Sequence, residues 1–133
     1  MEDIIKFLNI NKFGSLATSG ANKPDVRPFE FVFYCDRGMF FYTSASSELV
    51  KQLKENSNIC FCATDSSYNY VKVNGTVLFS EEEDDKSKIL EKSEFAKTIF
   101  KDQTLEKMII FYLPKGNCIQ HFHDNNKTIT KEF

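Results

Sequence analysis

The sequence contains no tryptophan and only five glycines, three prolines and two histidines among its 133 residues. Its formal net charge is −2, so it lacks the positive surplus with which nucleic-acid-binding proteins attract phosphates. No apolar run approaches the roughly 20 residues that a membrane-spanning helix requires. We therefore expect neither a nucleic-acid nor a membrane partner. The first eight residues are acidic and amphipathic, unlike a secretory signal, which predicts a cytoplasmic protein with four reduced cysteines.

The sequence also lacks a convincing set of metal ligands. Cys60 and Cys62 share one face of a predicted strand, and His121 and His123 share a face of another. Structural zinc sites gather four ligands and usually separate paired cysteines by two or more residues. The two pairs lie far apart in the sequence, so we expect ordinary strand positions and no metal. No thiol has a neighbouring base that would activate it, and no catalytic residue is assigned.

Phenylalanine, by contrast, is abundant, with 14 residues, and the segment 26–53 organises the chain around it. A strand is predicted from Val26 to Cys35, with phenylalanines recurring at period two. The short turn Asp36–Gly38 predicts a hairpin into a second strand that ends near Ser44. A helix containing Leu49 and Leu53 follows. Four residues are expected on one buried face of the first strand: Phe29, Phe31, Phe33 and Cys35.

The remaining segments complete a mainly β fold that also contains helices. Further strands are predicted over 15–19, 59–64, 70–79, 108–113 and 118–123, and helices over 2–11 and 82–100. Gly75 marks a bulge or a close approach inside its strand. Ser80–Glu83 fits a capping box, and the acidic run Glu81–Asp85 is interpreted as a solvated helix start. Turns rather than helices join most strands, which predicts six to seven antiparallel strands in a nearly closed barrel, with about three peripheral helices.

Hydroxyl groups collect where the second hairpin strand meets its helix, in the segment 43–47. A helix N-terminus carries unpaired N–H donors and a partial positive charge, so it is suited to binding a phosphate. Lys51 lies about one turn into the helix, and Arg27 opens the neighbouring strand. The alternative is that Ser46 or Ser47 merely caps the helix while Arg27 faces water. These residues alone leave both interpretations open.

The order of the motifs identifies a resemblance to a known family. A short N-terminal helix is followed by G-S-L-A-T, P-D-V-R-P-F, F-Y-T-S, K-Q-L-K-E-N and Y-V-K-V-N-G. This order resembles the FMN-binding split barrel of the pyridoxamine 5′-phosphate oxidase-like superfamily, above all its small members related to nitroimidazole-resistance proteins. The resemblance covers roughly residues 2–123. It implies a single FMN-binding split-barrel domain over residues 1–133.

The resemblance also implies the residues that bind the cofactor. The strand that passes the flavin ring corresponds to Arg27, Pro28, Phe29, Glu30 and Phe31. The end of the next strand, which contacts the ring and its phosphate, corresponds to Tyr42, Thr43 and Ser44. The following helix corresponds to Ser47 and Lys51. Tyr70 takes the position that reaches the flavin from the partner subunit of a homodimer.

The chain departs from the family pattern at three points. The helix usually begins Ser-Arg-Lys with two cations on the phosphate, whereas this chain reads Ser47-Glu48-Leu49. Val32 replaces a lysine near the end of the flavin strand. The true oxidase also uses a tryptophan that this sequence does not contain. We therefore do not expect oxidation of pyridoxamine phosphate.

The resemblance implies an FMN-dependent oxidoreductase that reduces a small aromatic or nitro compound with electrons from NAD(P)H. A flavin-binding protein without turnover, acting as an electron carrier or sensor, is the first alternative. A split barrel that binds haem is the second, with His121 and His123 as candidate axial ligands. The sequence does not identify the substrate or the electron donor.

Overall fold

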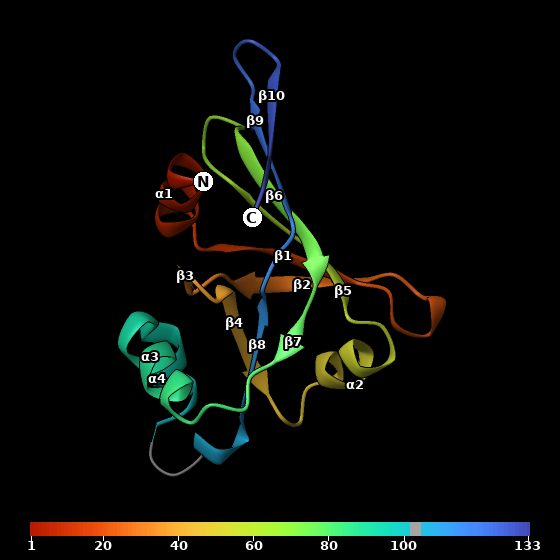
Figure 1. Ribbon diagram of the computed structural model, residues 1–133, viewed down its shortest axis with the longest axis vertical. Helices are drawn as coiled ribbons and strands as arrows, with labels where there is room; N and C mark the ends of the chain where they lie inside the picture. The colour runs from red at the N-terminus through yellow and green to blue at the C-terminus, as the bar shows by residue number, and fades with distance from the viewer. Residues whose placement is uncertain (102–104) are drawn as a thin grey trace.

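The computed structural model describes residues 1–101 and 105–133, and within these residues ten strands form two antiparallel sheets (Figure 1). The six-stranded sheet has the order β10-β9-β6-β5-β1-β2, with β1 Phe13–Thr18, β2 Asp25–Glu30, β5 Asn58–Thr64, β6 Tyr70–Thr76, β9 Asn117–Phe122 and β10 Lys127–Glu132. The four-stranded sheet has the order β3-β4-β8-β7, with β3 Phe33–Cys35, β4 Gly38–Ser44, β7 Leu78–Phe79 and β8 Met108–Leu113. The predicted split β-barrel is confirmed.

In the described part of the chain, four α-helices lie around the sheets: α1 Glu2–Ile10, α2 Glu48–Glu55, α3 Asp84–Lys92 and α4 Glu94–Ile99. Short 3₁₀ turns occur at η1 Gly20–Asn22 and η2 Leu105–Lys107. In Figure 1, α1 lies beside the upper part of the six-stranded sheet, α2 lies at the lower right, and α3 and α4 lie together at the lower left. The hairpin of β9 and β10 projects from the top of the molecule.

The prediction of one continuous strand from Val26 to Cys35 is wrong. The chain leaves the six-stranded sheet after Glu30 and enters the four-stranded sheet at Phe33. Between them, the Phe31 N–H donates to the Lys12 carbonyl at 2.8 Å and the Val32 N–H donates to the Phe40 carbonyl at 3.1 Å. Hydrogen bonds that leave one sheet for the other bend the chain, so period two does not continue through the bend.

The bend also separates the phenylalanines that the sequence placed on one face. Phe31 is buried between the two sheets, whereas Phe33 is buried on the outer side of the four-stranded sheet. A second predicted strand, 70–79, divides in the same way at Val77, whose N–H donates to the Ser57 carbonyl at 2.9 Å. These two divisions, together with β10, explain why ten strands form where six to seven were predicted. Gly75 is a close-approach point, as predicted, because a Cβ there would lie 2.8 Å from Leu113 Cδ2.

The prediction of one helix over 82–100 is also wrong, because Ser93 interrupts it. Ser93 has extended dihedral angles (φ −126°, ψ 111°) and ends α3. Its hydroxyl accepts a hydrogen bond from the Ala96 N–H at 2.9 Å, so the same residue caps α4. Four residues at helical spacing along 82–100 are nevertheless all buried, as one inward face requires: Ile89, Ser93, Ala96 and Phe100.

Two hydrophobic clusters result from this arrangement. An inner cluster fills the space between the sheets and includes Phe31, Phe41, Phe61 and Phe111. An outer cluster lies between the four-stranded sheet and the pair α3 and α4, and includes Val32, Phe40, Tyr42, Ile89 and Phe100. The outer cluster is what brings α4 against the ends of β2 and β4.

The turn between β3 and β4 connects this outer layer to α3. Gly38 adopts φ +135°, and a Cβ there would collide with the Leu113 carbonyl, so the turn requires glycine. The turn presents Arg37, whose Nη1 lies 2.8 Å from Asp85 Oδ1 in α3. The Ser80 hydroxyl also donates to Asp85. The solvated-start interpretation is therefore wrong for Asp85, which is fully buried, and Ser80 binds this carboxylate instead of capping a helix.

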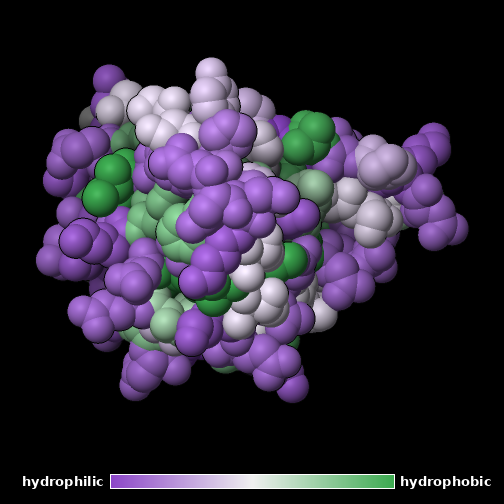
Figure 2. All heavy atoms as spheres, turned by 90° about the horizontal axis from the view of Figure 1, so that it is seen from above, coloured by the Kyte–Doolittle hydropathy of each residue, from purple (hydrophilic) through white to green (hydrophobic). Residues whose placement is uncertain are grey.

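Within residues 1–101 and 105–133, no helix is long and apolar enough to cross a membrane. Figure 2 views the end of the molecule that lies at the top of Figure 1, and the surface there is mostly hydrophilic with small hydrophobic patches.

Candidate functional site

A cavity of about 300 Å³ lies where the ends of β2 and β4 meet α4 and the start of β1. Its lining is aromatic and aliphatic with a few polar groups, and comprises Phe13, Pro28, Phe29, Glu30, Tyr42, Thr43, Ser44, Phe95, Ile99 and Phe100. A cavity of this size at the lower end of the usual range, with apolar walls and few polar groups, is typical of a small-molecule site. We call it the α4 cavity.

The rim of the α4 cavity exposes large apolar side chains. Phe13 and Phe95 contact each other edge to face, with ring centroids 5.8 Å apart. Phe13 is 58% exposed, Phe95 50% and Ile99 45%. Exposed apolar groups that gather beside a hollow mark a surface that another molecule can cover.

A carboxylate is buried in the wall of this apolar cavity. Glu30, at the end of β2, is only 7% exposed. The Tyr42 hydroxyl from β4 donates to Glu30 Oε1 at 3.2 Å, and the Ser93 hydroxyl from the α4 N-terminus donates to the same oxygen at 2.7 Å. The carboxylate thus joins both sheets to α4 through neutral donors.

Tyr42 remains a donor throughout the ordinary pH range. Burial raises the pKa of its phenol well above the ordinary value of 10, and the neighbouring Glu30 carboxylate adds to the shift. Ionisation would place a second negative charge against Glu30 in a setting with little water. The hydrogen bond from Tyr42 to Glu30 is therefore stable at neutral pH.

Six of the eleven residues predicted to bind a cofactor line the α4 cavity: Pro28, Phe29, Glu30, Tyr42, Thr43 and Ser44. The other five lie elsewhere: Arg27, Phe31, Ser47, Lys51 and Tyr70. Phe31 belongs to the inner cluster and is fully buried there. The structure thus gathers the ring side of the predicted site, while most of the predicted phosphate side lies outside the cavity.

Arg27 is already engaged by neighbours on β1, β2 and α2. Its Nη2 donates to Asp25 Oδ2 at 2.9 Å and to Gln52 Oε1 at 2.6 Å. Its Nη1 donates to Thr18 Oγ1 at 3.0 Å and to the Leu16 carbonyl at 3.2 Å. Hydrogen bonds, first from Gln52 and also from the Val26 N–H, hold the pKa of Asp25 below its ordinary value. The guanidinium therefore ties α2 to the sheet and does not simply face water.

Ser47 caps α2, because its hydroxyl accepts a hydrogen bond from the Leu49 N–H at 3.0 Å. Next to it, the Ser44 and Ser46 hydroxyls lie 3.1 Å apart. Lys51 lines a different hollow on α2, together with Glu48, Glu55 and Asp25. The hydroxyls thus gather at the helix start as predicted, but Lys51 lines a separate hollow that also contains acidic residues.

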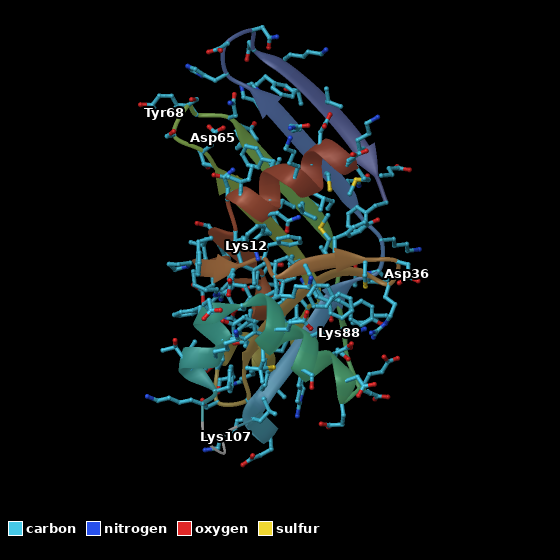
Figure 3. All side chains as sticks on the ribbon, turned by 90° about the vertical axis from the view of Figure 1, so that its left-hand side faces the viewer. Lys12, Asp36, Asp65, Tyr68, Lys88 and Lys107 are labelled. Atoms are coloured by element: carbon cyan, nitrogen blue, oxygen red, sulfur yellow. The ribbon has the colours of Figure 1, made fainter. Side chains whose placement is uncertain are left out.

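Tyr70 lies on β6, which β5 and β1 separate from β2 in the sheet. Its ring stacks on His121 with centroids 4.9 Å apart. His123 contacts Tyr68, which lies at the opposite end of the molecule from α3 and α4 (Figure 3). Neither histidine nor Tyr70 is among the cavity-lining residues of its own chain.

Cys60 and Cys62 occupy alternate positions of β5, both half-buried. Burial raises the pKa of both thiols, so neither is an activated thiolate. In the part of the chain that the structure describes, no three His, Cys, Asp or Glu side chains group as metal ligands.

Sequence reasoning missed the contribution of α4 and of the start of β1. Ser93, Phe95, Ile99 and Phe13 complete the cavity or its network, and none was predicted to do so. One signal was available for Ser93, which is a small polar residue within an otherwise apolar helical stripe. Such a position is typical of a buried hydroxyl that binds a partner.

A family model described as pyridoxamine 5′-phosphate oxidase matches residues 1–110, so the chain belongs to this family. The match covers β2, β4 and α4, and hence every residue that lines the α4 cavity. No curated protein matches the sequence.

Solved structures reproduce the same fold at low sequence identity. A NimC/NimA family protein from Clostridium acetobutylicum superimposes with a TM-score of 0.84 and 18% identity, over 100% of this chain and 92% of that one. A candidate 5-nitroimidazole antibiotic resistance protein from Bacteroides thetaiotaomicron gives 0.66 and 17%, over 85% and 78%. A haem binding protein from Mycobacterium smegmatis gives 0.77 and 12%, over 98% and 56%. At these identities the similarity shows the fold alone.

Proposed function

We propose that this chain binds FMN at the α4 cavity, as a homodimer, and uses it to reduce a small aromatic or nitro compound with electrons from NAD(P)H. The observation that carries the proposal is the convergence of six predicted cofactor residues on one cavity. Family membership supports the cofactor, and the nitroimidazole-resistance neighbour supports the substrate class.

The α4 cavity suits the ring system of a flavin. Pro28, Phe29, Tyr42 and Phe100 are among its lining residues, so a flat aromatic ring meets apolar surfaces there. The open rim at Phe95 leaves room for a substrate to approach. When bound, FMN would supply electron and hydride transfer at its ring, while the protein binds and orients the reactants.

The phosphate is proposed to lie at the N-terminus of α2. Thr43 and Ser44 line the cavity and continue into the hydroxyls of Ser46 and Ser47. The helix start adds N–H donors and its dipole, and both favour an anion. For Arg27 to join the phosphate, its guanidinium has to leave its present partners, and Lys51 has to turn out of the separate hollow that it lines.

The second subunit is proposed to cover the rim of the cavity and the outward face of the six-stranded sheet. Alternate strand residues point outward there and are only half-buried, including Ala17, Cys60, Cys62, Tyr70 and Ile119. A face of this kind suits a twofold interface, for which about 800 Å² per partner is sufficient. Tyr70 could then approach the flavin of the partner subunit, as the family resemblance implies.

The two alternatives remain distinct in what they require. A flavin carrier or sensor needs the same cavity without turnover. A haem protein needs an axial ligand, and the fold of the haem binding neighbour motivates that test. His121 lies within β9, where it hydrogen-bonds to Thr128 and stacks on Tyr70 of its own chain.

The proposal is tested by titrating the purified protein with FMN, riboflavin and haem and recording absorbance and binding. We expect FMN to bind more tightly than riboflavin or haem. Arg27→Ala and Lys51→Ala should each lower the affinity for FMN by about tenfold or more, because each removes a charge-assisted contact with the phosphate. Equal affinity for FMN and riboflavin would contradict the proposed phosphate site. Oxidation of NADH or NADPH by the FMN-loaded protein distinguishes an enzyme from a carrier, and sedimentation across a concentration series measures the dimer.

A further inference from the structure

Among the described residues that line the α4 cavity, one side chain is charged, and it is acidic. These residues include Glu30 but no lysine, arginine or histidine. The other walls are phenyl rings, an isoleucine and a proline, together with the neutral hydroxyls of β4. In surroundings of low polarity, one carboxylate determines which ligands are accepted, because its attraction for donors is screened only weakly.

The hydrogen bonds of Glu30 leave one of its oxygens available. Among the residues that the structure describes, both side-chain hydrogen bonds to this carboxylate end on Oε1, and none ends on Oε2. Among the same residues, no fully buried side-chain oxygen lacks a partner. Oε2 is therefore reachable from the cavity, while Tyr42 and Ser93 hold the group in place.

The donors on Oε1 are neutral hydroxyls, so the charge of Glu30 is stabilised but not cancelled by a cation. A ligand that places an N–H group on Oε2 completes the coordination of the carboxylate. A ligand that carries its own carboxylate meets repulsion and finds no cation among the described lining residues.

We infer that Glu30 makes the α4 cavity selective for aromatic ligands that carry an N–H donor, and above all for cationic ones, and that it rejects aromatic carboxylates. The inference rests on the proposed function only in taking this cavity as the ligand site. The N–H donor has two possible sources, the imide of a flavin ring and an amino group of the reducible substrate. Glu30 is a specificity-determining residue in either case.

The test uses four probes of one shape and measures their binding to the flavin-free protein by calorimetry. Benzamidine is a cationic donor, benzamide a neutral donor, acetophenone a neutral ring without N–H, and benzoate an anion. We expect affinity to fall in that order, with benzamidine at least about tenfold tighter than benzoate. Equal affinities across the series would overturn the inference.

Glu30→Gln keeps the size of the side chain and removes its charge, so the preference for benzamidine over benzoate should shrink at least about tenfold. Glu91→Gln, at an exposed position of α3 outside the cavity, makes the same change in net charge and should preserve the preference. A preference that survives Glu30→Gln would contradict the inference. If that variant does not fold, the comparison of benzamide with acetophenone on the wild type still decides, because the two differ only in the N–H group.

A second arm repeats the series with FMN present at saturation. If benzamidine no longer binds, the flavin covers Glu30 and its imide is the N–H donor. If benzamidine still binds, Glu30 remains open and the donor belongs to the substrate. Both outcomes support the selectivity. The inference and the proposed function also fail separately. If FMN does not bind but the probes rank as expected, the proposed function falls alone, and if FMN binds while the probes rank equally, the inference falls alone.

Discussion

Two buried carboxylates, Asp85 in the first turn of α3 and Glu30 at the end of β2, have contrasting partners. Asp85 accepts two hydrogen bonds from Arg37, at 2.8 and 3.0 Å, and one from Ser80. Glu30 accepts hydrogen bonds only from two hydroxyls among the described side chains. Asp85 is fully buried, whereas Glu30 borders a cavity.

The difference separates a structural carboxylate from one available to a ligand. The guanidinium of Arg37 neutralises Asp85 and packs on the rings of Phe40 and Tyr112, at 5.0 and 5.2 Å from their centroids. A carboxylate that is paired with a cation and fully buried is not available to bind a ligand. Glu30 has no cation among its described hydrogen-bond partners and keeps one oxygen open to the α4 cavity.

The largest expected effect in this comparison is the removal of the cation from Asp85. Arg37→Ala leaves a buried carboxylate unpaired, which should lower the free energy of unfolding by about 3–5 kcal/mol. Denaturant unfolding measures this. Lys97→Ala, which breaks the exposed pair with Glu94 at 3.0 Å, is the control and should cost no more than about 1 kcal/mol. Similar costs for the two variants would mean that the Asp85 pair contributes no more than a surface contact.

The pH dependence of stability should also report on Asp85. Burial raises the pKa of this carboxyl, but the hydrogen bonds from Arg37 and Ser80 outweigh burial and leave the pKa below its ordinary value of 3.8. A lowered pKa in the folded state means that the stabilisation is fully present above 3.8 and is lost as the pH falls through the folded-state pKa. Acid unfolding curves of the wild type and Asp85→Asn should therefore converge below pH 3.8. Curves that stay parallel there would contradict the assignment.

A smaller effect distinguishes two helix caps. Ser93 caps α4 and also donates to Glu30, whereas Ser47 only caps α2. Ser47→Ala should cost about 1 kcal/mol of stability, and Ser93→Ala about 2 kcal/mol because a buried acceptor also loses its donor. Thermal unfolding of the two variants compares them. An equal cost would show that the bond between Ser93 and Glu30 adds nothing to the cap.

The sequence predicted the elements well but not their bends. Alternation identified a strand through Phe33, yet it could not reveal that the chain changes sheets after Phe31. The Phe31 N–H still donates to the Lys12 carbonyl beside β1, whereas the Val32 N–H donates to the Phe40 carbonyl of β4. The reason is physical, since hydrophobic alternation records burial and both sides of the four-stranded sheet are buried. The same ambiguity joined α3 and α4, because Ser93 fits the inward face of either one helix or two.

Part of the candidate site could likewise be predicted, and part could not. The resemblance identified Glu30, Tyr42 and Thr43, which lie near one another in the sequence. The partner of Glu30, Ser93, is 63 positions away, and the partner of Arg37, Asp85, is 48 positions away. Pairs of this kind depend on how α3 and α4 pack on the sheet, and local sequence patterns do not predict that packing.

The most direct test of the central claim, that the α4 cavity is the cofactor site, is to fill the cavity and titrate the protein with FMN. Ile99→Trp places a larger ring at a cavity-lining position that is 45% exposed, so the fold should tolerate it. Leu78→Trp is the control, at a position that is 51% exposed and borders a different hollow. The account predicts that Ile99→Trp weakens FMN at least about tenfold while Leu78→Trp binds as the wild type does. Unchanged FMN affinity in a folded Ile99→Trp protein would contradict the account.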